Sequence, residues 1–83
     1  MKVITAKEDN VVKILLPDST DVTITEDDIT FDDENGTNIY TDLGSTNTTL
    51  YENITVPNGK EVRKHTFNGT AWGTNPNYTA PLD

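Results

Sequence analysis

The stretch DVTIT, residues Asp21–Thr25, decides the fold, because apolar and polar residues alternate along it one by one. Successive side chains of a β-strand point to opposite faces of the sheet, so the pattern predicts a half-buried strand with Val22 and Ile24 facing inward. The next segment, Ile29–Asp32, repeats this alternation. Two such segments in a row indicate an all-β domain.

Similar short segments lie on both sides of this stretch. The most apolar one is Val11–Leu16, in which Val12, Ile14 and Leu16 are expected on one face. It stops at Pro17, since proline has no N–H to donate to a neighbouring strand. The predicted strands are Lys2–Thr5, Val11–Leu16, Asp21–Thr25, Ile29–Asp32, Thr37–Thr41, Leu50–Val56, Glu61–Phe67 and Thr70–Gly73.

Turn signals separate these segments. Asn35-Gly36 and Asn68-Gly69 predict tight hairpins, because both residues tolerate the positive φ angles of a type I′ turn. The sequence therefore predicts a small antiparallel sandwich or barrel of about seven to eight short strands over residues 1–73. A two-residue loop at Asn68-Gly69 would set His65 opposite Trp72, with Arg63 on the same face.

The last ten residues, 74–83, differ from the rest and are predicted to form an extended C-terminal arm. Pro76 and Pro81 disfavour continued sheet pairing. Two interpretations stay open: a frayed terminus, or an arm that places Tyr78 and Leu82 on a neighbouring subunit.

The charge of the chain restricts its partners. Six basic residues against fourteen acidic ones give a net charge of -8, which repels nucleic acid and anionic membranes, so neither is an expected partner. The longest apolar run, Ile14-Leu15-Leu16, is also too short to span a membrane. The chain begins without the apolar core of a secretory signal.

The sequence supplies little with which to build a core. Only 33% of the residues are hydrophobic, and there is no cysteine. Small domains with so little to bury are usually completed by disulfides, metals or oligomerisation. Since disulfides are excluded, we expect self-association or docking on a larger assembly.

Catalytic residue types are scarce. The chain has one histidine, His65, and its two serines are Ser19 and Ser45. A nucleophilic triad would need the histidine between a serine and a carboxylate. A packing cluster of Arg63 and His65 against Trp72 is the favoured interpretation, and we expect neither an enzyme nor a bound cofactor.

One acidic hairpin is a candidate calcium site. The segment Asp32–Gly36 superficially resembles an EF-hand loop. With Gly36 at the invariant glycine, Asp33 and Asn35 take the third and fifth positions, but the first ligand position falls on Phe31. The EF-hand interpretation therefore fails. A looser turn site formed by Asp32, Asp33 and Asn35 is the alternative to a solvated acidic tip.

Three stretches of the C-terminal third form one pattern: Ile54–Gly59, with a strand ending in Val-Pro, Lys64–Trp72, with Phe-Asn-Gly-Thr-Ala-Trp, and Asn75–Tyr78, with Asn-Pro. This pattern resembles short structural proteins of tailed bacteriophages. The resemblance implies a virion component that docks on the major capsid protein as a decoration or cement protein, or else a tail or fibre component. On a capsid three-fold position, self-association would give a trimer.

Contact in such an assembly is expected through strand edges and the tail. The interface candidates are aromatic or lie close to aromatic residues: Tyr40, Tyr51, Arg63, His65, Trp72, Tyr78 and Leu82. A module of another class, which stacks carbohydrate on Trp72 and the tyrosines, is the alternative.

Overall fold

The structure, a computed structural model, describes residues 1–78 and confirms the all-β prediction. Its eight short antiparallel strands form three small sheets, ordered β2-β1-β6, β3-β4-β5 and β7-β8. The strands are β1 (Lys2–Ala6), β2 (Val12–Leu16), β3 (Val22–Ile24), β4 (Ile29–Asp33), β5 (Gly36–Tyr40), β6 (Thr48–Tyr51), β7 (His65–Phe67) and β8 (Trp72–Thr74). Among residues 1–78 there is no helix with the length and apolarity needed to cross a bilayer.

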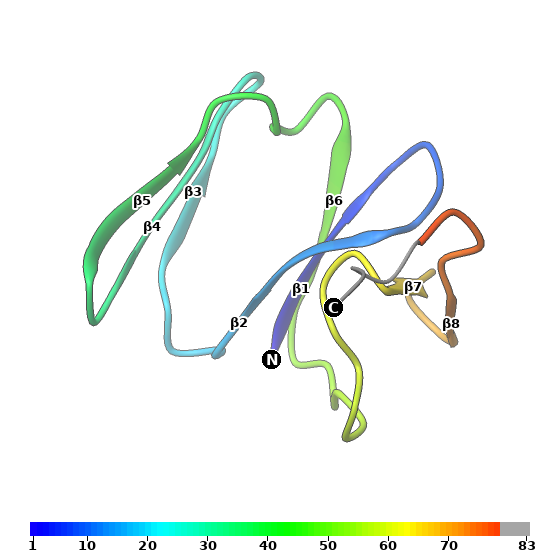
Figure 1. Cartoon of the computed structure of the whole chain (residues 1–83). Helices are drawn as coiled ribbons and strands as arrows, with labels where there is room; N and C mark the ends of the chain where they lie inside the picture. The colour runs from blue at the N-terminus through cyan, green and yellow to red at the C-terminus, as the bar shows by residue number, and fades with distance from the viewer. Residues whose placement is uncertain (79–83) are drawn as a thin grey trace, which may run out of the picture.

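The sheet β2-β1-β6 is the central layer, with β3-β4-β5 on one side and the β7-β8 hairpin on the other (Figure 1). Burial is complete along the inner strand, where Val3 and Ile4 point to opposite faces and both are fully buried. Two separate cores result. The first joins Ile4, Ile14, Leu16, Ile29 and Phe31, and the second joins Val3, Val12 and Phe67.

A register shift in β2 divides its apolar residues between these two cores. Ile14 pairs with Ile4 and Val12 pairs with Thr5, so Lys13 has no partner in β1, as in a β-bulge. The extra residue turns Val12 to the opposite face from Ile14. The prediction that Val12, Ile14 and Leu16 share one face is therefore wrong for Val12, because strict alternation does not survive a bulge.

Both predicted Asn-Gly turns differ from the type I′ geometry. Gly36 has a positive φ of 119° but Asn35 does not, and the loop residues are Glu34 and Asn35. In the β7-β8 hairpin, Phe67 pairs with Trp72 and His65 pairs with Thr74. The loop thus has four residues, and the predicted pairing of His65 with Trp72 is wrong.

The Asn68 side chain accounts for this longer loop. Its Oδ1 accepts hydrogen bonds from the N–H groups of Thr70 (2.9 Å) and Ala71 (2.8 Å). Such a side chain reproduces a backbone turn and stabilises a wider loop than the dipeptide alone predicts.

Two strands are shorter than predicted, and in both the missing part contains a residue with left-handed backbone. Strand β6 ends at Tyr51 rather than Val56, since Asn53 has a φ of 57°, and β7 begins at His65 rather than Glu61, since Arg63 has a φ of 68°. A left-handed residue cannot continue a strand.

The described part of the predicted tail, residues 74–78, is tied to the domain by hydrogen bonds, and the rest of the predicted arm lies outside the described residues. Strand β8 includes Thr74, and the next residue, Asn75, ties the chain to the domain. Its N–H donates to the Lys64 carbonyl (2.9 Å) and its Nδ2 to the Arg63 carbonyl (2.7 Å), while the Tyr78 N–H donates to the Asn75 carbonyl (3.2 Å).

Candidate docking groove

The outer edge of β2, together with Val11 just before it, consists of a covered first half, Val11 and Val12, and an open second half. In the first half, Val11 forms a bridge with Thr66, and the Arg63 N–H donates to the Val12 carbonyl (2.7 Å). Along its second half, Lys13–Leu16, the backbone makes no hydrogen bond to any segment of residues 1–78 other than β1. This second half is an open strand edge.

A groove of about 580 Å³ runs along the open half. One wall is the edge of β2 with Pro17, and the other is the β4-β5 hairpin. Val62 lines it from the loop before β7. The lining residues are Lys13, Ile14, Leu15, Leu16, Pro17, Thr20, Phe31, Asp33, Glu34, Asn35, Asn38, Tyr40 and Val62.

Apolar side chains line the groove on both sides of the β2 edge. Phe31, 7% exposed, belongs to the first core, and the Tyr40 ring stacks on it with centroids 6.0 Å apart. Tyr40 remains 36% exposed and Val62 40% exposed. Exposed aromatic and branched side chains beside an unpaired strand edge are the features of a protein-binding surface.

The net negative charge of the molecule is concentrated on the β3-β4-β5 sheet, which forms one wall of the groove. Residues 21–42, which contain β3, β4 and β5, carry eight acidic and no basic residues. The other six acidic residues equal the six basic residues in number, so the net charge of -8 belongs to this segment alone (8 = 14 − 6). The groove therefore lies at the boundary between an acidic sheet and an electrically balanced remainder.

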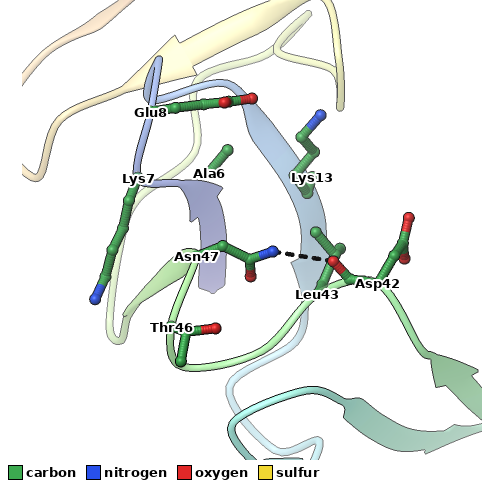
Figure 2. Close-up of a pocket in the computed structure, with 8 residues that line it drawn as sticks. All are labelled: Ala6, Lys7, Glu8, Lys13, Asp42, Leu43, Thr46 and Asn47. Atoms are coloured by element: carbon green, nitrogen blue, oxygen red, sulfur yellow. Dashed lines mark hydrogen bonds between the residues drawn. The ribbon is translucent and has the colours of Figure 1, made fainter.

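A second hollow, of about 470 Å³, lies where the loop between β5 and β6 faces the end of β1. Figure 2 shows Asn47 in it, and Lys7 directed away from the other side chains. The Asn47 Nδ2 donates to the Asp42 carbonyl (3.0 Å), and its Oδ1 accepts from the Gly44 N–H (2.8 Å). Asn47 thus holds its own loop in shape, and its amide is occupied by that role.

Three predicted interface residues belong to the second core or close its loop. Tyr51 and Trp72 are half-buried and pack on Phe67, with ring centroids 5.1 Å and 4.6 Å away. His65 is buried, and its Nδ1 accepts a hydrogen bond from the Glu61 N–H (3.0 Å). These residues stabilise the hairpin side of the domain.

The other predicted interface residues lie apart from one another. Arg63 is exposed but stands in a turn rather than on the face with His65, and Tyr78 is 39% exposed beyond β8. Leu82 lies outside the described residues. Among the described candidates only Tyr40 lines the groove.

The calcium candidates form the tip of the β4-β5 hairpin, where their oxygens accept hydrogen bonds from the same hairpin. Asp32 Oδ1 accepts from the Thr37 hydroxyl (2.6 Å), and Asp33 accepts from the Asn35 N–H and the Asn38 amide (both 2.8 Å). Within residues 1–78 no group of three or more acidic or histidine side chains is placed to hold a metal ion.

The sequence pattern does not reveal Val62, Asn38 or the open edge of β2 as members of one site. They come from three different parts of the chain, and the two strands of the groove belong to different sheets. The sequence feature that could have indicated this site is the absence of basic residues around Asn38, which makes the β3-β4-β5 sheet acidic.

Comparisons with protein-family models, with curated proteins and with solved structures give no match to this chain.

Proposed function

We propose that the chain is a non-enzymatic docking protein of a tailed-bacteriophage virion, which adds to the head as a decoration or cement protein. The observation that carries the docking role is the groove, in which an open strand edge lies beside exposed Tyr40 and Val62. Strand edges of this kind bind partners by main-chain hydrogen bonds. The assignment to a virion is supported by the resemblance of the C-terminal third to phage structural proteins.

Self-association, as a trimer, is part of this proposal, and the charge distribution restricts its geometry. Because the net charge lies between Asp21 and Asp42, like charges oppose contact between the acidic sheets of two copies. Copies are expected to meet through the β7-β8 side. Light scattering during size-exclusion chromatography is expected to give a trimer, and a monomer at every concentration would contradict this part.

The carbohydrate alternative receives less support from the geometry. A sugar-stacking platform needs an accessible aromatic face. Trp72 instead packs on Phe67 at 4.6 Å, and Tyr51 packs on the same ring. A glycan that binds the wild-type chain and is lost in Trp72→Ala with the fold intact would restore the alternative.

Gene neighbourhood and virion composition test the proposal. Capsid, portal or tail genes are expected beside the gene for this chain. Mass spectrometry of purified virions should then find the chain in copy numbers comparable with the major capsid protein. A few copies per virion would indicate the tail or a fibre, and absence from virions would contradict the proposal.

A further inference from the structure

We propose that Lys13–Leu16, the open half of the β2 edge, binds an extended partner segment that pairs antiparallel with β2 beneath Tyr40 and is basic at its amino-terminal end. The inference rests on the proposed docking function and deepens it, since it names the surface and the chemistry of the partner.

The chain itself demonstrates that this edge of β2 accepts an antiparallel strand. The segment Arg63–Phe67 lies along the first half, joined by the antiparallel Val11–Thr66 bridge and by the bond from the Arg63 N–H to the Val12 carbonyl. The left-handed φ of 68° at Arg63 then diverts the chain away. A partner segment would continue this ladder along Lys13–Leu16, in the same direction as Arg63–Phe67.

The walls of the groove specify apolar side chains in the partner. Alternate residues of a strand point to opposite sides. Those on one side of a guest strand would meet Phe31 and Tyr40, and those on the other side would meet Leu15 and Val62. Each side of the guest strand therefore meets one partly exposed apolar side chain, Tyr40 on one side and Val62 on the other.

The charges specify basic residues at one end of the partner. Phe31 pairs with Val22, so Asp33 lies beyond the start of β3, at the Thr20 end of the groove. Glu34 lines the same end, which β2 approaches at Pro17. An antiparallel guest begins at this end, and lysine or arginine there complements the two carboxylates. The same charges disfavour the acidic sheet of a second copy as the occupant.

The test uses a short capped peptide of two lysines followed by alternating valine and threonine, titrated into the isotope-labelled full chain. The matched control peptide has the same residues in reverse order. Amide chemical-shift changes are expected at Lys13–Leu16 and Tyr40. The lysine-first peptide should bind about tenfold more tightly than the reversed one, with a difference that shrinks as salt is added.

Two variants and one control variant locate the site. Tyr40→Ala should weaken binding of the lysine-first peptide by about tenfold, while Tyr78→Ala, which removes a similarly exposed tyrosine outside the groove, should leave it unchanged. The double variant Asp33→Asn, Glu34→Gln should abolish the preference between the two peptides. It stays informative even when Tyr40→Ala perturbs the fold.

Three results would overturn the proposal: peptide-induced amide chemical-shift changes at the β3 or β6 edges, equal affinity of the two peptides, or no binding at millimolar peptide. Sedimentation with virions that lack the chain separates this failure from that of the proposed function. If the wild-type chain and Tyr40→Ala sediment with the virions equally well, the docking function stands and the groove is rejected as its site. Wild-type chain that does not sediment rejects the function.

Discussion

The two faces of the central sheet are covered in different ways. On the hairpin side, Tyr51, Phe67 and Trp72 pack on one another, and Arg63–Phe67 occupies the edge of β2. On the acidic side, the β3-β4-β5 sheet covers the core but leaves Tyr40 exposed and the rest of the β2 edge unpaired. On the hairpin side the aromatic residues pack into the domain, whereas on the acidic side Phe31 is buried and Tyr40 remains available to a partner.

The largest expected effect comes from Phe67, which is 3% exposed and lies in the second core. Phe67→Ala should lower the free energy of unfolding by about 3–5 kcal/mol, since it leaves a cavity between Val3 and Val12. Urea denaturation followed by far-ultraviolet circular dichroism measures it. Tyr40→Ala, the control on the acidic side, should lower the free energy of unfolding much less. Equal losses of stability in the two variants would contradict the difference between the two sides.

A substitution at Gly44 tests how the acidic sheet is attached. A Cβ at this position would lie 2.2 Å from the Glu26 carbonyl oxygen, which belongs to the turn between β3 and β4. Gly44→Ala should therefore lower stability by about 1–3 kcal/mol, because backbone must move. Thermal denaturation compares it with Ser45→Ala, next to it on the exposed loop. Similar melting temperatures for the two variants would reject this close contact.

Replacing two buried threonines by valine should change the stability of the chain in opposite directions. The Thr5 hydroxyl is buried without a hydrogen-bond partner among the described residues, so Thr5→Val should raise the free energy of unfolding by about 1 kcal/mol. The Thr48 hydroxyl donates to the Gly44 carbonyl at 2.6 Å, and Thr48→Val should lower it by about 1 kcal/mol. Chemical denaturation that shifts both in the same direction would contradict these assignments.

The smallest effect concerns Asp18, in the turn after β2. Its Oδ2 accepts a hydrogen bond from the Met1 amino group (3.0 Å), and its Oδ1 accepts one from the Asn53 N–H (3.1 Å). The amino group is the main cause that lowers the pKa of Asp18 below its ordinary value. A lowered pKa in the folded state means that the interaction stabilises the fold at neutral pH and is lost on acidification through the carboxyl range.

Asp18→Asn should accordingly be slightly less stable than the wild-type chain at neutral pH, and the difference should shrink as the pH falls through the lowered pKa of Asp18. Urea midpoints at a series of pH values measure it. A difference that grows on acidification would contradict the sign.

Local sequence was sufficient for the fold class and for the strands with clean alternation. Strands β4 and β5 lie within one residue of the predicted bounds, because Ile29 and Phe31 have only one way to face a core. Prediction failed where a single residue breaks the pattern. The bulge at Lys13 and the left-handed Asn53 and Arg63 depend on tertiary contacts that periodicity does not encode.

The candidate site was predicted only in part. Tyr40 was an interface candidate and lines the groove, but Trp72 and His65, the chemically most distinctive residues, are used in packing and loop closure. The sequence does not predict the groove, since the groove lies between β2 and the β4-β5 hairpin, and β2 and β5 pair with neither each other nor a common neighbour.

Hydrogen exchange of the Lys13–Leu16 backbone amides, measured by NMR with and without the lysine-first peptide, tests the open edge most directly. In the free chain, the amides that face away from β1 should exchange rapidly, whereas the Arg63 and Phe67 amides, bonded to the Val12 and Asn10 carbonyls, should be protected. The peptide should then protect the Lys13–Leu16 amides. Protection already present in the free chain, or exchange unchanged by the peptide, would contradict the account.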